Sequence, residues 1–221
     1  MVAGGIGEGD GYGGYRSRLV ETLQRKGIRD LAVLRAIGTV PRHLFVPESV
    51  RHRAYDDVAL PISGGQTISQ PWVQARYLEL AGLTGRERVL EVGAGSGYQT
   101  ALLTVLADAV FAVERIPALA QSARKALEAA GIRNVTVLVG DGTLGWRPFA
   151  PYDAILVAAA SPEIPAPLVD QLAPSGRLII PLGDRQNQVL TLGRRVGDEL
   201  QLSTVADVRF VPLLGEFGFS S

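Results

Sequence analysis

The chain has 221 residues, which is enough for one sizeable domain with a full hydrophobic core and a small appended subdomain. Its hydrophobic fraction of 47% and charged fraction of 20% are ordinary for a globular protein, and 22 basic residues balance 22 acidic ones to a formal net charge of zero. This balance gives no electrostatic case for a nucleic-acid partner or an anionic membrane, and the lack of cysteine excludes disulfides, cysteine-bound metals and thiol nucleophiles.

The sequence also lacks the features of membrane-spanning, secreted and histidine-bound metal proteins. No stretch approaches the roughly 20 apolar residues of a membrane span, and the first residues lack the basic segment and apolar run of a secretory signal. His43 and His52 have no ligand partner at helical or turn spacing. We therefore expect a cytoplasmic protein with no membrane, nucleic-acid or metal partner.

The first third of the chain predicts a helical extension. Residues 1–14 are rich in glycine and show no periodicity, so we expect a disordered tail. Apolar positions at helical spacing predict two short amphipathic helices between residues 15 and 38. Pro71 favours the first turn of a third helix over residues 72–80. Together, residues 15–82 form the expected N-terminal helical and loop extension.

From residue 88 onward, strand and helix patterns alternate. Strands are expected at 88–92, 109–113, 135–139, 153–158, 176–181, about 187–194 and 200–209, and helices at 97–107, 117–130 and 165–172. Alternation of this kind predicts an α/β domain with a mostly parallel twisted sheet and helices on both faces. The last two strands are expected to form an antiparallel hairpin.

A glycine-rich segment follows the first of these strands. Residues 93–97 read Gly-Ala-Gly-Ser-Gly and lie between the apolar strand 88–92 and the next helix. Closely spaced glycines in this position let backbone amides approach a nucleotide-like ligand. The pattern is GxGxG followed by Tyr98, so the third glycine of the dinucleotide fingerprint is missing.

Two acids narrow the ligand further. Glu91 stands at the end of the first strand, where it would repel a pyrophosphate but could hold a sulfonium-bearing amino-acid moiety. Glu114 ends the next strand about 20 residues on, where an acid can accept hydrogen bonds from both ribose hydroxyls. This arrangement favours S-adenosylmethionine over NAD.

The segment 64–71, Gly-Gly-Gln-Thr-Ile-Ser-Gln-Pro, allows two interpretations. In the first, Ser69 or Gln70 is only the N-cap of the helix that Pro71 begins. In the second, the segment is a loop that forms part of a site, because a simple cap does not require the glycines and polar residues that precede it.

Together with other stretches, this segment resembles the protein-L-isoaspartate (D-aspartate) O-methyltransferase family. The resemblance extends over nearly the whole chain and is carried by residues 40–47, 60–62, 65–71, 89–98, 113–115, 140–142, 151–155, 175–181 and 208–213. The glycine motif alone marks any methyltransferase of this fold, whereas GQTISQP at 65–71 and VRFVPL at 208–213 are much more particular. The resemblance implies a Rossmann-like S-adenosylmethionine-dependent methyltransferase fold, with residues 83–221 as the methyltransferase domain.

The resemblance also implies roles for individual residues. Those implied to bind S-adenosylmethionine, or its product S-adenosylhomocysteine, are Gln66, Thr67, Ile68, Glu91, Gly93, Gly95, Gly97, Glu114, Asp141 and Gly142. Those implied to bind the substrate are Ser69, Val208, Arg209, Phe210 and Val211, the last four through their backbone. Ser69 is also the implied active-site hydroxyl.

The implied reaction is methylation of the abnormal carboxylate of L-isoaspartyl residues in damaged proteins and peptides, with D-aspartyl residues as a second candidate substrate. The methylation initiates repair through a succinimide. A carboxylate is already ionised at neutral pH, so the reaction needs no general base. Two alternatives are a methyltransferase for a different small-molecule or protein acceptor and a non-catalytic nucleotide-binding domain. The presence of Glu91, Glu114, Asp141 and Ser69 together argues against the second.

Overall fold

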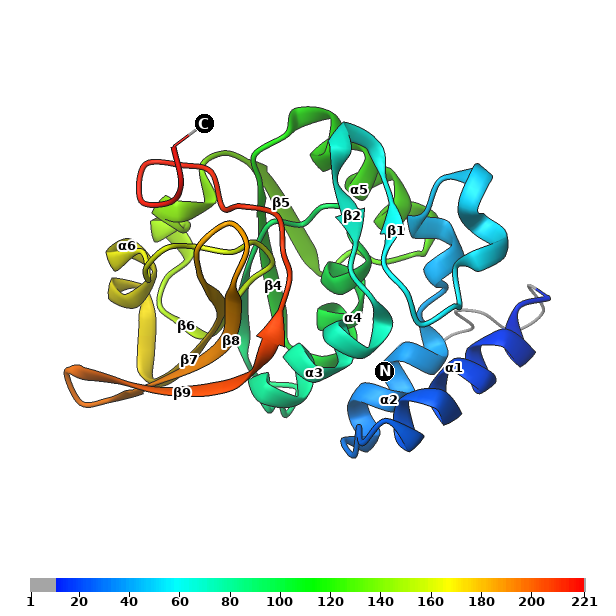
Figure 1. Ribbon diagram of the computed structural model, residues 1–221, viewed down its shortest axis with the longest axis horizontal. Coiled ribbons are helices and arrows are strands. Elements are labelled where there is room, and N and C mark those ends of the chain that lie inside the picture. Colours follow the sequence, from blue (N-terminus) through cyan, green and yellow to red (C-terminus); the bar gives the residue numbers. More distant parts are fainter. Residues whose placement is uncertain (1–10, 221) are drawn as a thin grey trace.

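The computed structural model describes residues 11–220 and has a central seven-stranded sheet (Figure 1). Its strands are β3 (Arg88–Val92), β4 (Ala109–Glu114), β5 (Val135–Val139), β6 (Tyr152–Val157), β7 (Leu172–Gly183), β8 (Gln188–Val196) and β9 (Glu199–Val208). The order across the sheet is β5-β4-β3-β6-β7-β8-β9, with β3 to β7 parallel and β8 and β9 antiparallel. The predicted mostly parallel sheet and its terminal hairpin are therefore confirmed.

Side chains of the strands alternate between two hydrophobic cores. On β3, Val89 packs in the core that also contains Leu78, Leu102 and Leu127, whereas Leu90 packs in the core on the other face with Leu168. The helices that supply these residues are α3 (Pro71–Ala81), α4 (Tyr98–Leu106), α5 (Pro117–Ala129) and α6 (Ala166–Asp170). Three helices thus cover one face, and the short α6 lies on the other.

The N-terminal extension adds further helices and a small hairpin to the first face. Its elements are α1 (Gly13–Arg25), α2 (Leu31–Thr39), β1 (Leu60–Pro61), β2 (Thr67–Ile68) and 3-10 turns at Arg42–Phe45, Glu48–Arg53 and Ser63–Gly65. Figure 1 shows α1 and α2 at one end of the molecule, away from the β8–β9 hairpin. Two further 3-10 turns, Gly142–Leu144 and Arg147–Phe149, follow β5.

The structure differs from the expected boundaries at two places. Gly13 and Gly14 form the first turn of α1, although they were assigned to the tail 1–14; residues 1–10 lie outside the described residues. The expected helix 165–172 is shortened to α6, because Leu172 already pairs with Tyr152 at the start of β7. Leu172, which the sequence pattern assigned to the helix, therefore belongs to the sheet.

Candidate active site

A cavity lies at the carboxyl ends of β3, β4 and β6, where open parallel sheets bind ligands. The residues that follow these three strands and line it are Gly93, Ala94, Gly95, Ser96, Arg115, Ile116, Ala158 and Ala159. Two other segments complete the wall, residues 66–69 from β2 and residues 211–214 from the C-terminal segment. The cavity therefore unites parts of the chain that are far apart in sequence.

The glycine loop after β3 has the backbone that its sequence requires. Gly93 and Gly95 have φ angles of 91° and 54°, in the left-handed region that glycine adopts without a steric cost. The amide of Gly95 donates a hydrogen bond to Glu114 Oε2 at 2.8 Å, and Ile116 N donates to Glu114 Oε1 at 2.9 Å. Glu114 therefore links the loops after β3 and β4 and still has acceptor positions left for a ligand.

Glu91 lies deeper in the cavity wall and is fully buried. Its Oε2 accepts a hydrogen bond from Thr100 Oγ1 at 2.5 Å, while its Oε1 has no partner among the described residues. Burial raises the pKa of this carboxyl group to about 8. The buried amide nitrogen of Gln99, which also lines the cavity, has no partner either.

These unpaired atoms make the site a suitable one for the amino-acid end of a ligand. A buried oxygen without a donor costs free energy unless a ligand supplies one, and an ammonium group would do so at Glu91 Oε1. The acceptor at Glu91, the glycine loop and the acid Glu114 fit an amino acid joined to a nucleoside. The residues present therefore fit S-adenosylmethionine.

The wall that contains Ser69 is fixed from two directions. Arg42 Nη2 donates to the backbone oxygen of Ser69 at 2.9 Å. On the other side, Asp57 accepts hydrogen bonds from Gln70 Nε2 at 3.1 Å and from Trp72 N at 2.8 Å. No hydrogen bond of the described residues occupies the Ser69 hydroxyl. The Ser69 backbone is therefore held while its hydroxyl stays available.

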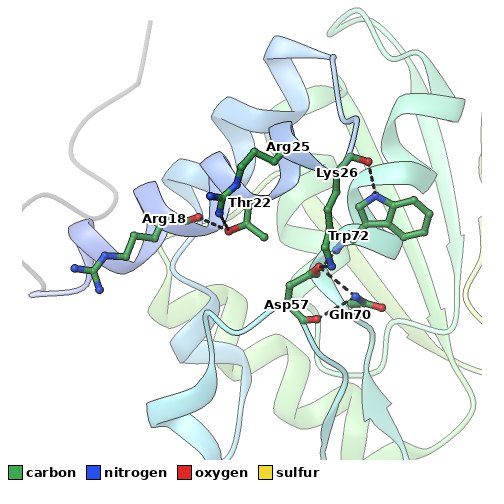
Figure 2. A network of polar contacts seen from close by, with 7 residues as sticks. All are labelled: Arg18, Thr22, Arg25, Lys26, Asp57, Gln70 and Trp72. Carbon is green, nitrogen blue, oxygen red and sulfur yellow. Dashed lines mark hydrogen bonds and ion pairs between the residues drawn. The ribbon is translucent and has the colours of Figure 1, made fainter.

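Figure 2 shows how Asp57 connects α1 to the start of α3. Lys26 at the end of α1 forms an ion pair with Asp57 Oδ2 at 2.5 Å, and its backbone oxygen accepts from Trp72 Nε1 at 3.3 Å. The expectation that Ser69 or Gln70 caps α3 through its side chain is wrong, because Gln70 is the N-cap residue but its side chain makes no capping bond. Asp57 caps the helix instead.

The structure brings most of the predicted site residues together around this cavity. Those that line it are Gln66, Thr67, Ile68, Ser69, Glu91, Gly93, Gly95, Glu114, Gly142 and Val211. Those outside its wall are Gly97, Asp141, Val208, Arg209 and Phe210.

Gly97 and Asp141, which lie outside the wall, have other contacts. Gly97 begins α4 in the left-handed region, where a Cβ atom would lie 3.1 Å from the Cβ of Ala123. Asp141 accepts hydrogen bonds from Thr143 N and from Glu216 N, at 2.9 and 2.8 Å. These contacts lower the pKa of Asp141 despite the opposing effect of its partial burial, and they attach the C-terminal segment beside Gly142.

Phe210 is held in place by a side chain of β8. Its backbone nitrogen donates to Gln188 Oε1 at 2.6 Å, and its backbone oxygen accepts from Gln188 Nε2 at 3.1 Å. Its ring packs against Tyr77 with centroids 5.6 Å apart. The nitrogen of Phe210 is therefore paired with a side chain of β8, while its carbonyl oxygen keeps one acceptor position.

Gln74 and Gln99 line the cavity but were not selected from the sequence. They are 4% and 7% exposed, on the inward faces of α3 and α4. A long polar side chain at an inward position of a predicted helix is the signal that indicates such residues. Trp72, by contrast, packs beside α1 and does not line the cavity.

The sheet order, the glycine loop and the two acids define the class of the protein, a Rossmann-like S-adenosylmethionine-dependent methyltransferase. A family model named Protein-L-isoaspartate(D-aspartate) O-methyltransferase matches residues 14–218. The protein-L-isoaspartate O-methyltransferase of Roseiflexus sp. (strain RS-1) is 52% identical over 204 residues, which are 92% of this chain and 94% of that protein. The chain belongs to the protein-L-isoaspartate (D-aspartate) O-methyltransferase family.

Solved structures agree with this assignment. A protein-L-isoaspartate O-methyltransferase structure superimposes with a TM-score of 0.84 at 30% identity, covering 92% of this chain and 67% of that chain. A Plasmodium falciparum protein of the same name, in complex with S-adenosyl-L-homocysteine, has a TM-score of 0.80 at 29% identity, covering 90% and 98%. The expected family, enzyme class and cofactor are confirmed. No helix within residues 11–220 is long and apolar enough to cross a membrane.

Proposed function

We propose that this protein transfers a methyl group from S-adenosylmethionine to the abnormal side-chain carboxylate of L-isoaspartyl residues, and also of D-aspartyl residues, in damaged proteins and peptides. The methyl ester then closes to a succinimide, and hydrolysis returns part of it to normal aspartate. The observation that carries the proposal is that Ser69 and the glycine loop line one cavity. The absence of cysteine suits the reducing cytoplasm, where we expect the enzyme to act.

The glycine loop and the two acids would hold the cofactor. Glu91 Oε1 would accept from the ammonium of the methionine part, the loop amides at Gly93 and Gly95 would surround this part, and Glu114 would take the ribose hydroxyls. Gly142 would lie against the adenine edge. When bound, the cofactor supplies an electrophilic methyl group on a sulfonium. The reaction product S-adenosylhomocysteine would bind to the same residues.

Ser69 would orient the acceptor. Its hydroxyl can donate a hydrogen bond to one oxygen of the substrate carboxylate and so direct the other oxygen toward the methyl group. The carboxylate is ionised at neutral pH and no base is needed, so orientation is the main contribution of the chain. Holding two reactants in line can supply about 7–11 kcal/mol of the barrier. Arg42 and Asp57 support this role by fixing the backbone around Ser69.

The peptide backbone would bind along the C-terminal segment. Val211 lines the cavity, and Val208 ends β9, the edge strand of the sheet. An edge strand can pair with an extended peptide through backbone hydrogen bonds, which are indifferent to side chains. This mode would suit an enzyme that accepts many flanking sequences. Phe210 would contribute through its packed ring and the remaining acceptor position of its carbonyl oxygen, because its nitrogen is already paired.

The proposal is tested by methyl transfer from labelled S-adenosylmethionine to an isoaspartyl peptide and to its aspartyl twin of otherwise identical sequence. We expect label only on the isoaspartyl peptide, and the label should be lost in mild base because it is an ester. Label on both peptides, or on neither while S-adenosylhomocysteine still binds, would show that the acceptor is a different one.

A further inference from the structure

Tyr77 is a buried residue of α3 that does not itself line the cavity. Its hydroxyl donates a hydrogen bond to the backbone oxygen of Val157, the last residue of β6, at 3.1 Å. Its ring packs against the ring of Phe210, which directly precedes the cavity residue Val211. One side chain of α3 therefore contacts both the end of β6 and the C-terminal segment.

The hydrogen bond to Val157 fills a gap in the sheet. Leu156 lies opposite Ile179 in the parallel pair of β6 and β7, so the amide of β7 that would reach Val157 O is that of residue 181. This residue is Pro181, which has no N–H to donate. The Tyr77 hydroxyl supplies the missing donor instead. Burial raises the pKa of Tyr77 well above its usual value, so the hydroxyl keeps its proton at neutral pH.

The gap stands where β6 separates from β7 and begins to form part of the cavity wall. Ala160 pairs with the C-terminal segment and not with β7. Its N–H donates to Val211 O at 2.8 Å, and its oxygen accepts from Leu213 N at 2.7 Å. Both of these partners line the cavity. Residues 158–160 and 211–213 therefore form one paired unit, which we call the acceptor wall.

We propose that Tyr77 is a positioning residue that sets the acceptor wall for the incoming peptide. It contacts the residue before each segment of this wall, Val157 through its hydroxyl and Phe210 through its ring, and so holds the two segments in register. Gln188 holds the backbone of Phe210 from the other side, at 2.6 and 3.1 Å. The inference rests on the proposed function, in which the peptide backbone binds along residues 208–211.

The test compares two buried tyrosines. Tyr77→Phe removes only the hydroxyl and keeps the ring in place. Tyr152→Phe is the matched control, because its hydroxyl also donates to a backbone oxygen, that of Trp146 at 2.6 Å, and neither of these residues lines the cavity. For the wild type and both variants, we would measure urea unfolding, kcat and KM with the isoaspartyl peptide, the Kd of S-adenosylhomocysteine, and amide hydrogen exchange of residues 208–214.

Both variants should be less stable than the wild type, because each leaves a backbone oxygen without its hydroxyl donor. Only Tyr77→Phe should also raise the peptide KM, by about three- to tenfold, and accelerate exchange of residues 208–214 by a similar factor. We expect the Kd of S-adenosylhomocysteine to stay at the wild-type value in both variants.

A purely structural role of Tyr77 predicts that the two variants match in peptide KM and in exchange, and this result would overturn the inference. A rise in the Kd of S-adenosylhomocysteine with an unchanged peptide KM would overturn it as well. If the wild type does not methylate the isoaspartyl peptide, the proposed function fails. The exchange of residues 208–214 then still decides whether Tyr77 positions the wall.

Discussion

Glu91 and Glu114 stand at the ends of neighbouring strands, yet their partners differ. Both oxygens of Glu114 accept backbone hydrogen bonds, from Gly95 and Ile116. Glu91 has a single hydroxyl partner, Thr100, and one buried oxygen without any. Glu114 therefore organises the cofactor loops before any ligand arrives, whereas Glu91 depends on the ligand to complete its hydrogen bonds.

The burial of Glu91 has a consequence for the pH dependence of stability. In the folded protein its pKa is raised from 4.5 to about 8, so between these values the folded state binds more protons than the unfolded state. The free energy of unfolding of the ligand-free protein should therefore fall as the pH rises through this range. We expect Glu91→Gln to remove this part of the slope in urea unfolding. A variant whose slope equals that of the wild type would contradict the burial argument.

Glu114→Ala tests the proposed ribose contact. Hydrogen bonds to a charged group contribute about 1.5–3 kcal/mol, so we expect the affinity for S-adenosylhomocysteine to fall by this amount in calorimetry. Part of the loss would come from the glycine loop, because Gly95 N would lose its acceptor. An unchanged affinity would remove Glu114 from the cofactor site.

Among the elements, α3 shows how the N-terminal extension supports the site. The helix begins at Pro71, directly after Ser69 and Gln70, and its first free amide is capped by Asp57 from a loop before β1. A substitution of Asp57 is therefore expected to disturb the backbone beside Ser69. Lys26, although paired with Asp57, is 47% exposed, so its ion pair is largely screened by solvent.

Asp57→Ala should lower the free energy of unfolding by about 0.5–2 kcal/mol through the lost cap alone. Lys26→Ala should cost less than about 1 kcal/mol, because the exposed ion pair contributes little and its backbone contact with Trp72 remains. Urea unfolding of the two variants measures the difference. Equal losses would mean that the ion pair, and not the cap, is the important contact of Asp57.

Local patterns in the sequence predict most helices and strands, but they do not predict the side-chain contacts that fix these elements in place. The first-turn proline Pro71 locates α3, and periodicity locates α5, whose buried residues Leu119, Ala123 and Leu127 lie on one face. The Asp57 cap and the Gln188 contacts with Phe210 could not be predicted, since each joins residues at least 15 positions apart through a side chain. The short hairpin β1–β2 shows no periodicity, because two-residue strands are too short to produce one.

At the scale of the whole molecule, three parts of the chain form the cavity. The sheet domain supplies the glycine loop and the acids, the extension supplies Ser69 and Gln74, and the C-terminal segment completes the wall with residues 211–214. The sequence motifs indicated all three parts, and within the extension they indicated Ser69 but not Gln74. Gln74 could not be selected from the sequence, because its partner Arg42 lies 32 positions away and becomes a neighbour only in the fold.

The division between the sheet domain and the N-terminal extension predicts that substitutions in these two parts have separable effects. A residue of the sheet domain such as Glu114 should control cofactor affinity, and a residue of the extension such as Ser69 should control the use of the acceptor. Ser63 provides a matched control, because it is an exposed serine of the same hairpin that does not line this cavity.

Turnover and cofactor affinity of Ser69→Ala, measured on the same preparation beside Ser63→Ala, therefore test whether the Ser69 hydroxyl orients the acceptor. We expect kcat/KM for the isoaspartyl peptide to fall about tenfold or more, because the hydroxyl serves only the acceptor, and the Kd of S-adenosylhomocysteine to stay at the wild-type value. A large loss of cofactor affinity with normal turnover at saturation would contradict it.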